Sequence, residues 1–371
     1  MNGADASPAP TRRLSYIDWM RGLAILIMIE AHVLDAWTRP ADRKTLAFGC
    51  LAVLAGFAAP MFLFLAGASA SLAASARERR TGNRAAAGAA VRRRGWQVFG
   101  LAYLFRFQAY VLSPRALLAG LLKVDILNIM GPSIVAAAAL WQSTGRVGRR
   151  LVILGAAALA VALVTPLVRT SPLVSWLPPV VQWYIRPAPG RNNFTFFPWS
   201  GFVFAGAFVG TLLDGGRRGS TRRLHAILGG GALLFASCSY AASDLPSIYA
   251  DSHFWTSAPT FFLLRVGIVT AVLSAVFFWE ERRRVLPLGG WSPMAQFGRS
   301  SLLVYWIHVE LVYGIFTHPL HHELPLGTAL LAFAVFTLLM FGMVVAKDGA
   351  VAQWKARRAA RAQRPEAEAA A

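Results

Sequence analysis

Arg21 and His32 lie eleven residues apart in "SYIDWMRGLAILIMIEAH", residues 15–32, a stretch otherwise rich in Leu, Ile, Met and Ala. In a helix, eleven residues turn through about 1100°, roughly 20° beyond three full turns, and rise about 16 Å, so the two side chains share one face. Ionisable groups in an apolar segment of membrane-spanning length are costly to bury and by default indicate a functional site. A histidine there can act as a general base, and Asp35, three residues beyond it, can orient its ring.

Each of these residues also has a structural explanation. Ser15 and Asp18 have the spacing of a capping box, so Asp18 can simply start the helix. Arg21 is close enough to the end of the segment for its long side chain to reach the membrane surface. A lone histidine inside a membrane can bond to a backbone carbonyl. For His32 we favour a functional role, because an arginine shares its face and a second histidine lies in another apolar segment.

That second concentration of polar groups is in "FGRSSLLVYWIHVELVYG", residues 297–314. Ser301, Tyr305 and His308 are spaced at i, i+4 and i+7, which places them on one stripe of a helix. Since this segment is predicted to cross the membrane in the same direction as the first, we expect His308 near the depth of His32, with both lining one cavity. The structural alternative is a seam of interhelical hydrogen bonds, each contributing about 1 kcal/mol.

Two other motifs add polar groups to apolar segments. "KVDILNIMGPS" places Asp125 and Asn128 near the outer end of a helix, and we expect Asp125 to pair with Lys123 or Arg115. "NNFTFFPWSGFVFAGAFVG" contains Trp199 and a glycine spacing that permits close helix contact. Taken singly, each of these motifs is better explained by packing than by chemistry.

Residues 318–323, "HPLHHE", combine three histidines with a glutamate. Pro319 interrupts helical spacing, and the segment falls in a predicted loop between apolar segments. We therefore predict an exposed loop that responds to pH, and no bound metal.

The elements that must position these residues are apolar helices. The chain has 371 residues, of which 56% are hydrophobic and only 15% charged, and its mean hydropathy is +0.50. This composition predicts an all-α, polytopic integral membrane protein. We count about ten transmembrane helices: residues 15–37, 46–76, 95–112, 117–141, 150–169, 194–213, 224–243, 257–279, 297–317 and 325–346. The second is too long for a straight crossing, so we expect it to protrude into the cytoplasm or to bend near Gly56 or Pro60.

The formal net charge of +20 is explained by topology. Basic residues concentrate in alternate connections, such as "RERRTGNRAAAGAAVRRR", "RRGSTRR" and "ERRR", which assigns both termini to the cytoplasm. The excess charge is therefore mostly a topology signal, with attraction to anionic lipid headgroups in addition, and no nucleic-acid partner is expected. We predict a cytoplasmic tail over 1–13, a transmembrane domain over 14–347 and a basic cytoplasmic tail over 348–371.

Five motifs in order resemble the bacterial relatives of heparan-alpha-glucosaminide N-acetyltransferase: "YIDWMRGLAILIMIEAH", "GFAAPMFLFLAGAS", "VDILNIMG", "FFPWSGFVFAGAFVG" and "GRSSLLVYWIHVELVYG". The Arg-x10-His arrangement of Arg21 and His32 also resembles the wider class of membrane acyltransferases that modify cell-envelope sugars. The resemblance implies an enzyme of the bacterial inner membrane that passes an acetyl group from cytoplasmic acetyl-CoA to an acceptor at the other face. In the lysosomal branch the position matching His32 is Asn, so here His32 itself is favoured as base or acyl carrier.

Resemblance and residue chemistry together give one set of candidates. The expected catalytic residues are His32, Asp35 and His308, those binding acyl-CoA are Arg21, Asp18, Arg106 and Arg299, and those binding the acceptor are Asp125, Asn128, Trp199, Ser301 and Tyr305. The expected partners are acyl-CoA, a glycan or amino-sugar acceptor, membrane lipid and a second copy of the chain in a homo-oligomer. The alternatives are a proton-coupled small-molecule permease, which also uses intramembrane Asp, His and Arg, and a lipid-binding or structural protein without catalysis.

Overall fold

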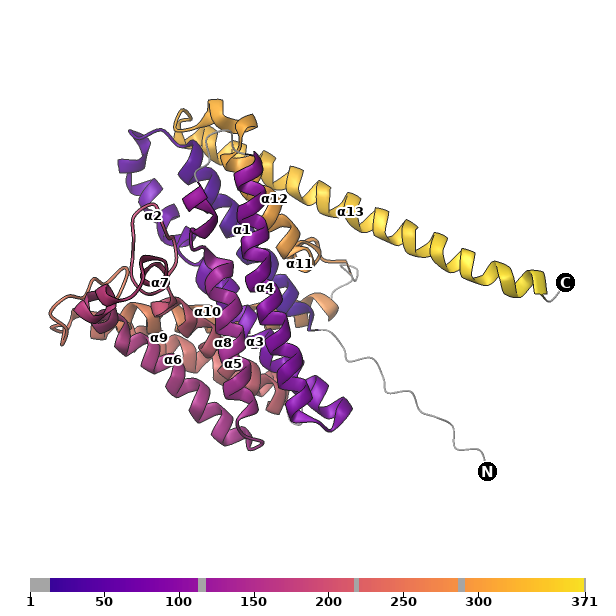
Figure 1. Cartoon of the computed structure of the whole chain (residues 1–371), viewed down its shortest axis with the longest axis horizontal. Helices are drawn as coiled ribbons and strands as arrows, with labels where there is room; N and C mark the ends of the chain where they lie inside the picture. The colour runs from indigo at the N-terminus through magenta and orange to yellow at the C-terminus, as the bar shows by residue number, and fades with distance from the viewer. Residues whose placement is uncertain (1–13, 113–117, 217–219, 286–290, 370–371) are drawn as a thin grey trace. The chain divides into compact units, whose positions relative to one another are not determined.

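The computed structural model describes residues 14–112, 118–216, 220–285 and 291–369, whose regular structure is helical throughout. Two isolated backbone bridges, Thr38 with Leu324 and Val124 with Asn192, are the β-type pairings among these residues. The α-helices, labelled in Figure 1, are α1 (Ser15–Trp37), α2 (Leu46–Ala55), α3 (Ala58–Thr81), α4 (Arg84–Leu112), α5 (Ile126–Gln142), α6 (Val147–Thr170), α7 (Pro179–Ile185), α8 (Phe196–Gly216), α9 (Thr221–Ala241), α10 (Pro259–Val285), α11 (Pro293–Arg299), α12 (Ser301–Tyr313) and α13 (Leu326–Ala369).

Within the described ranges, six helical segments are long and apolar enough to cross a membrane: Leu46–Thr81, Val147–Thr170, Phe196–Gly215, Thr221–Asp244, Pro259–Arg284 and Leu326–Arg358. The all-α membrane fold predicted from composition is thus confirmed. Two further apolar helices, α5 and α12, have 17 and 13 residues. The count of ten spans and the cytoplasmic placement of both termini stay predictions.

Helix boundaries follow local backbone chemistry. Of the two alternatives for the second segment, the structure supports an interruption near Gly56, because α2 ends at Ala55 and α3 begins at Ala58. The prediction of one continuous helix over 297–317 is wrong. Ser300 has φ −103° and ψ 18°, outside the helical region, and it separates α11 from α12.

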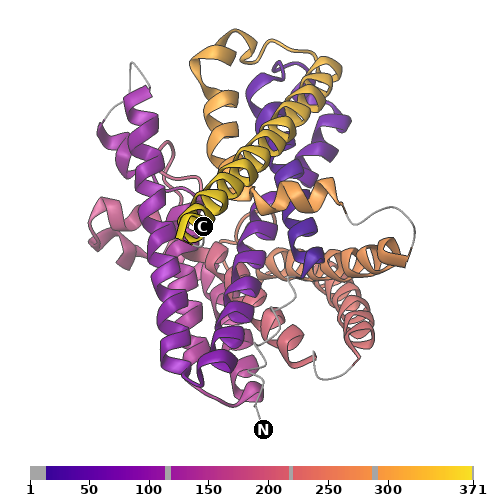
Figure 2. The ribbon, with the colours of Figure 1, turned by 90° about the vertical axis from the view of Figure 1, so that its right-hand side faces the viewer.

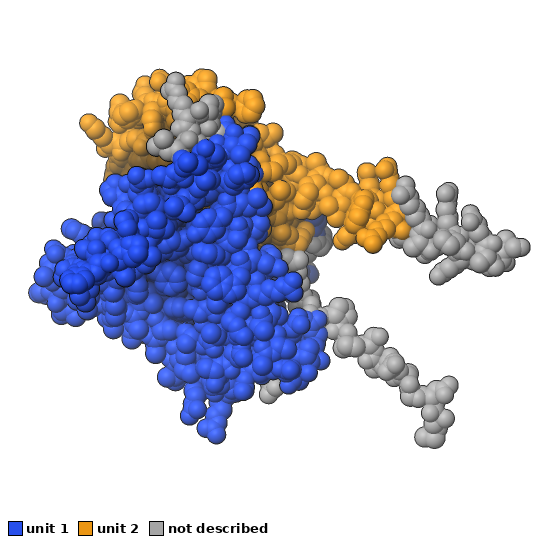
Figure 3. All heavy atoms as spheres, viewed as in Figure 1, with its two compact units in different colours: residues 1–17, 59–291 blue, residues 18–58, 292–371 orange. Residues whose placement is uncertain are grey.

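The chain divides into two compact units, coloured separately in Figure 3. Unit 1 comprises residues 1–17 and 59–291, and unit 2 comprises residues 18–58 and 292–371. Inside unit 1, α4 packs along α5, α6 along α8 and α9 along α10 (Figures 1 and 2). Glycines bring α3 and α8 together, since a Cβ at Gly206 would overlap the Phe64 carbonyl oxygen and one at Gly67 the Val203 carbonyl oxygen. The close helix contact predicted from the glycine spacing is therefore present.

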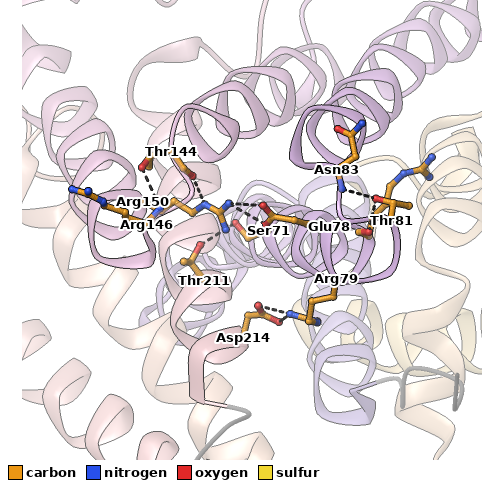
Figure 4. A network of polar contacts seen from close by, with 11 residues as sticks. Ser71, Glu78, Arg79, Thr81, Asn83, Thr144, Arg146, Arg150, Thr211 and Asp214 are labelled. Carbon is orange, nitrogen blue, oxygen red and sulfur yellow. Dashed lines mark hydrogen bonds and ion pairs between the residues drawn. The ribbon is translucent and has the colours of Figure 1, made fainter.

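Two ion pairs join α3 to its neighbours in unit 1 (Figure 4). Arg150 of α6 donates from Nη2 to the two carboxylate oxygens of Glu78 at 3.0 and 3.3 Å. Arg79 of α3 donates from Nη1 to the two carboxylate oxygens of Asp214 in α8, at 2.6 Å each. We call Glu78, Arg79, Arg150 and Asp214 the α3 ion-pair cluster.

Arg150 is the most deeply buried cation of this cluster, with 5% of its side chain exposed. Its Nε donates to the Thr144 carbonyl at 2.7 Å, and its guanidinium lies 4.0 Å from the centre of the Trp141 ring. Hydrogen bonds, a carboxylate and an aromatic face therefore compensate its burial together.

In unit 2, α1 is held against both α12 and α11. Trp37 donates its indole N–H to the Val312 carbonyl at 3.1 Å. At the other end of α1, a Cβ on Gly22 would overlap the Met294 carbonyl oxygen of α11, and one on Gly298 would overlap the Asp18 carbonyl oxygen of α1. Backbone therefore packs directly on backbone where these two helices cross.

The start of α13 is capped from a distant part of unit 2. Asp42 accepts a hydrogen bond from the backbone N–H of Leu326 through Oδ2, at 2.7 Å. This bond lowers the pKa of the Asp42 carboxyl below its ordinary value, and neighbouring Arg39 acts in the same direction.

Candidate active site

The structure brings the two predicted histidines into contact within unit 2. The ring centroids of His32 in α1 and His308 in α12 are 5.0 Å apart, and the rings meet edge to face at 83°. His308 is completely buried, whereas His32 is partly accessible. We call His32 and His308 the histidine pair.

Both rings are held by the same hydrogen bond to their own helix. Nδ1 of His32 lies 2.7 Å from the Met28 carbonyl oxygen, and Nδ1 of His308 lies 2.8 Å from that of Val304. A carbonyl oxygen can only accept, so Nδ1 carries the proton in each neutral ring and Nε2 keeps its lone pair. Nε2 of His308 is buried without a hydrogen-bond partner among the described residues. Burial disfavours the charged form of this ring, so His308 stays neutral.

Asp35 reaches His32 through a tyrosine. The Tyr313 hydroxyl donates to Oδ2 of Asp35 at 3.0 Å, and the Tyr313 ring packs edge to face against His32 with centroids 5.8 Å apart. The carboxylate also forms an ion pair with Arg43 at 3.6 Å. Sequence reasoning missed Tyr313 as a site residue, although it lies within the motif that contains His308.

The remaining candidates in unit 2 lie along the same two segments. The Tyr305 ring is 6.0 Å from His308, centroid to centroid, and Ser301 lies one turn earlier in α12. Arg21 pairs with the buried Asp18 at 3.2 Å and keeps 26% of its side chain exposed. Arg299, at the end of α11, is exposed.

Three other candidates meet in unit 1, between α4 and α5. Arg106 forms an ion pair with Asp125 at 2.6 Å, in place of the expected pairing with Lys123. Arg115, the other expected partner, lies outside the described residues. Asp125 is also the N-cap of α5, in a reciprocal capping box with Asn128. Starting the helix therefore explains much of the chemistry of this group.

Two tyrosines lie beside Asn128 in this group of residues. The hydroxyls of Tyr103 and Tyr184 are 2.9 Å apart, and the Asn128 amide lies 3.5 Å from Tyr184. Burial, followed by the Tyr103 hydrogen bond, raises the pKa of Tyr184 above its ordinary range. Burial, followed by the charge of Arg106, lowers the pKa of Lys123.

Trp199 lies at the start of α8, against Phe194 and Phe202, and lines a separate pocket of unit 1. Glu30 of α1 is buried, and neither carboxyl oxygen has a hydrogen-bond partner in the described part of the chain. In the "HPLHHE" loop, the His318 and His321 rings stack with centroids 5.8 Å apart. Among the described residues, no group of three His, Cys, Asp or Glu side chains is placed to hold a metal ion.

Residues 13–237 match the family described as "Heparan-alpha-glucosaminide N-acetyltransferase, catalytic". The match covers 225 of the 371 residues, more than half of the chain. It contains α1 with His32 and ends before α12, which contributes His308. No curated protein matches the chain.

Proposed function

This chain belongs to the heparan-alpha-glucosaminide N-acetyltransferase catalytic family, and we propose on that premise that the histidine pair is the centre of its acetyl transfer. The family makes the protein a membrane acetyltransferase. Our finer proposal is that acetyl-CoA from the cytoplasm is the donor, and that a sugar or amino sugar at the outer face of a bacterial inner membrane is the acceptor.

The observation that supports this proposal is the shared hydrogen-bonding state of the histidine pair. Each Nδ1–H is given to a backbone carbonyl, so each ring keeps an unprotonated Nε2 in a fixed orientation. General-base catalysis requires such a nitrogen near the proton that is removed. His32 is the proposed base, because its ring is the accessible one, and His308 orients it through the edge-to-face contact.

The proposed reaction balances without a further reactant. Nε2 of His32 takes the proton of the acceptor hydroxyl or amine while the acceptor oxygen or nitrogen bonds to the thioester carbonyl carbon. The carbon–sulfur bond breaks, and the CoA thiolate takes up the proton held by the histidine. The products are the acetylated acceptor and CoA with a free thiol.

The donor is proposed to enter along the face of α1 that carries Arg21. About 16 Å of helix rise separates Arg21 from His32, which is comparable to the pantetheine arm of CoA. Arg21 keeps 26% of its side chain exposed, so its guanidinium can contact the CoA phosphates. Arg299, exposed at the end of α11, is a second proposed phosphate contact.

Labelled acetyl-CoA provides the test. The purified full chain in nanodiscs is incubated with acetyl-labelled CoA and a panel of amino sugars, and free thiol and labelled sugar are measured together. We expect both to appear in equal amounts, to fall in His32→Ala, and to be unchanged in His253→Ala, which alters an exposed histidine of unit 1. Uptake of unmodified sugar into liposomes without CoA release would instead support the permease.

A further inference from the structure

Unit 1 contains a pocket of about 260 Å³ that the proposed reaction does not use. Its lining combines two arginines, several aromatic rings and no acidic side chain: Arg169, Pro187, Asn193, Pro198, Trp199, Phe202, Trp255, Thr256, Ala258, Phe261, Phe262 and Arg265. A pocket of this composition is suited to an anionic group attached to an apolar one.

The pocket lies where three helices of unit 1 end. Its lining comes from the last turn of α6 and from the first two turns of α8 and α10, together with the connections that flank them. The N-termini of α8 and α10 add partial positive charge to that of the arginines. The local field therefore favours an anion.

Arg169 both forms part of the pocket wall and supplies positive charge. Its guanidinium donates to the carbonyl oxygens of Phe197 and Thr256 and to the Thr195 hydroxyl, at 3.0 to 3.2 Å. These partners are neutral, so the positive charge of Arg169 is retained at the pocket. Arg265 lies over the Phe261 ring at 3.9 Å, which fixes its guanidinium beside the aromatic wall.

The aromatic residues form a graded wall from core to surface. Phe202, Phe261 and Phe262 are buried, whereas Trp255 is 59% exposed. The connections at this end of the helices also expose large apolar side chains, including Trp176 and Ile248, both 87% exposed. Exposed tryptophans where membrane helices end are typical of the lipid headgroup region.

We propose that this pocket binds the phosphate group of a membrane lipid, with Arg265 as the principal contact. The two arginines and two helix N-termini recognise the phosphate, and the aromatic wall covers the first carbons of the lipid chain. Arginine suits this role because its planar fork of N–H groups matches phosphate oxygens. The inference concerns binding alone and holds whether or not the histidine pair transfers acetyl groups.

Three probes separate the parts of such a ligand. Dioleoyl phosphatidic acid carries phosphate and chains, dioleoylglycerol carries the chains alone, and glycerol 3-phosphate carries the phosphate alone. Binding of each to the full chain in detergent is measured by native mass spectrometry, without acetyl-CoA. We expect phosphatidic acid to bind saturably, and Arg265→Gln to weaken it about tenfold, the effect of losing a charged hydrogen bond.

The matched control is Arg222→Gln, which removes the same charge from an exposed ion pair with Glu281 at the start of α9. It should leave phosphatidic acid binding unchanged. Equal affinity in the wild type and Arg265→Gln, or tight dioleoylglycerol binding that Arg265→Gln does not alter, would overturn the proposal. Glycerol 3-phosphate binding as tightly as phosphatidic acid, and lost in Arg265→Gln, would support the phosphate site with a soluble source.

A second variant pair keeps the test independent of how Arg265→Gln folds. Trp255→Leu removes the exposed end of the aromatic wall and should weaken phosphatidic acid binding about threefold. Trp176→Leu changes a more exposed tryptophan that does not line the pocket, and it should have no effect. Equal effects of the two variants would count against the pocket as the binding site.

Discussion

The α3 ion-pair cluster and the histidine pair bury polar groups in opposite ways. In the cluster, Arg150 has a carboxylate, a backbone carbonyl and an aromatic face around it. In the pair, each ring gives one hydrogen bond to its own helix, and Nε2 of His308 is buried with no partner in the described structure. A buried polar group whose hydrogen bonds are all made stabilises the fold. One with an unused donor or acceptor atom is available for chemistry.

The largest expected effect comes from removing the accessible ring of the histidine pair. His32→Ala should lower acetyl transfer about 10²- to 10⁴-fold, the usual contribution of a general base, and leave the thermal unfolding midpoint within about 3 °C. Labelled acetyl transfer and differential scanning fluorimetry measure the two quantities on one preparation. Activity equal to the wild type would remove His32 from the mechanism.

Breaking the α3 ion-pair cluster should lower stability and leave acetyl transfer unchanged, the reverse of the effect of His32→Ala. Arg150→Met leaves Glu78 without its partner in a partly buried site and should reduce the free energy of unfolding by about 2 kcal/mol, with transfer per folded molecule unchanged. Thermal and denaturant unfolding measure the loss.

The double variant Arg150→Met with Glu78→Met is the matched control. It removes both charges, so it should recover more than half of the lost stability. A double variant as unstable as Arg150→Met alone would show that Arg150 stabilises the fold through its contacts with Trp141 and Thr144, and not through the ion pair.

A variant of Tyr313 tests whether the active site includes residues beyond the histidine pair. Tyr313→Phe keeps the ring beside His32 and removes the hydrogen bond to Asp35, a contact of about 1 kcal/mol, so transfer should fall about fivefold. Tyr249→Phe is the control, since it removes a similar bond at 2.8 Å to the Leu163 carbonyl in unit 1. Equal transfer in both variants would limit the site to the histidine pair.

The smallest effect is expected at Asp42, a half-buried carboxylate whose hydrogen bonds are made. Hydrogen bonding lowers the pKa of Asp42 in the folded state, so its stabilisation is complete above the ordinary pKa of about 3.9 and is lost as the pH falls through the lowered value. Asp42→Ala should therefore unfold at a slightly lower temperature at pH 7, and the difference from wild type should vanish at strongly acidic pH. A difference that persists there would assign the effect to packing.

Much of this arrangement was predictable from local patterns. Apolar length and the Ser15 start predict a helix over 15–37, and α1 has those bounds. Equal depth in two segments predicts that His32 and His308 meet, because depth constrains a membrane helix even when its neighbours are unknown.

Other features depend on contacts that no single segment encodes. Ser300 leaves the helical region in a stretch whose composition predicts one helix. Asp125 forms an ion pair with Arg106, nineteen residues away on α4. Asp35 joins Tyr313 because the end of α12 returns to the end of α1. Periodicity assigns a residue to a face of its own helix, but it does not identify the residue opposite.

The crossing of α1 and α11 has a consequence for how this sequence can change over evolutionary time. Gly22 and Gly298 each face a carbonyl oxygen of the other helix, with no side chain between to be exchanged or repacked. A methyl group at either position cannot be offset by a smaller neighbour, because the obstacle is backbone. Among diverging descendants of this chain, both glycines should therefore persist while the apolar residues around them drift.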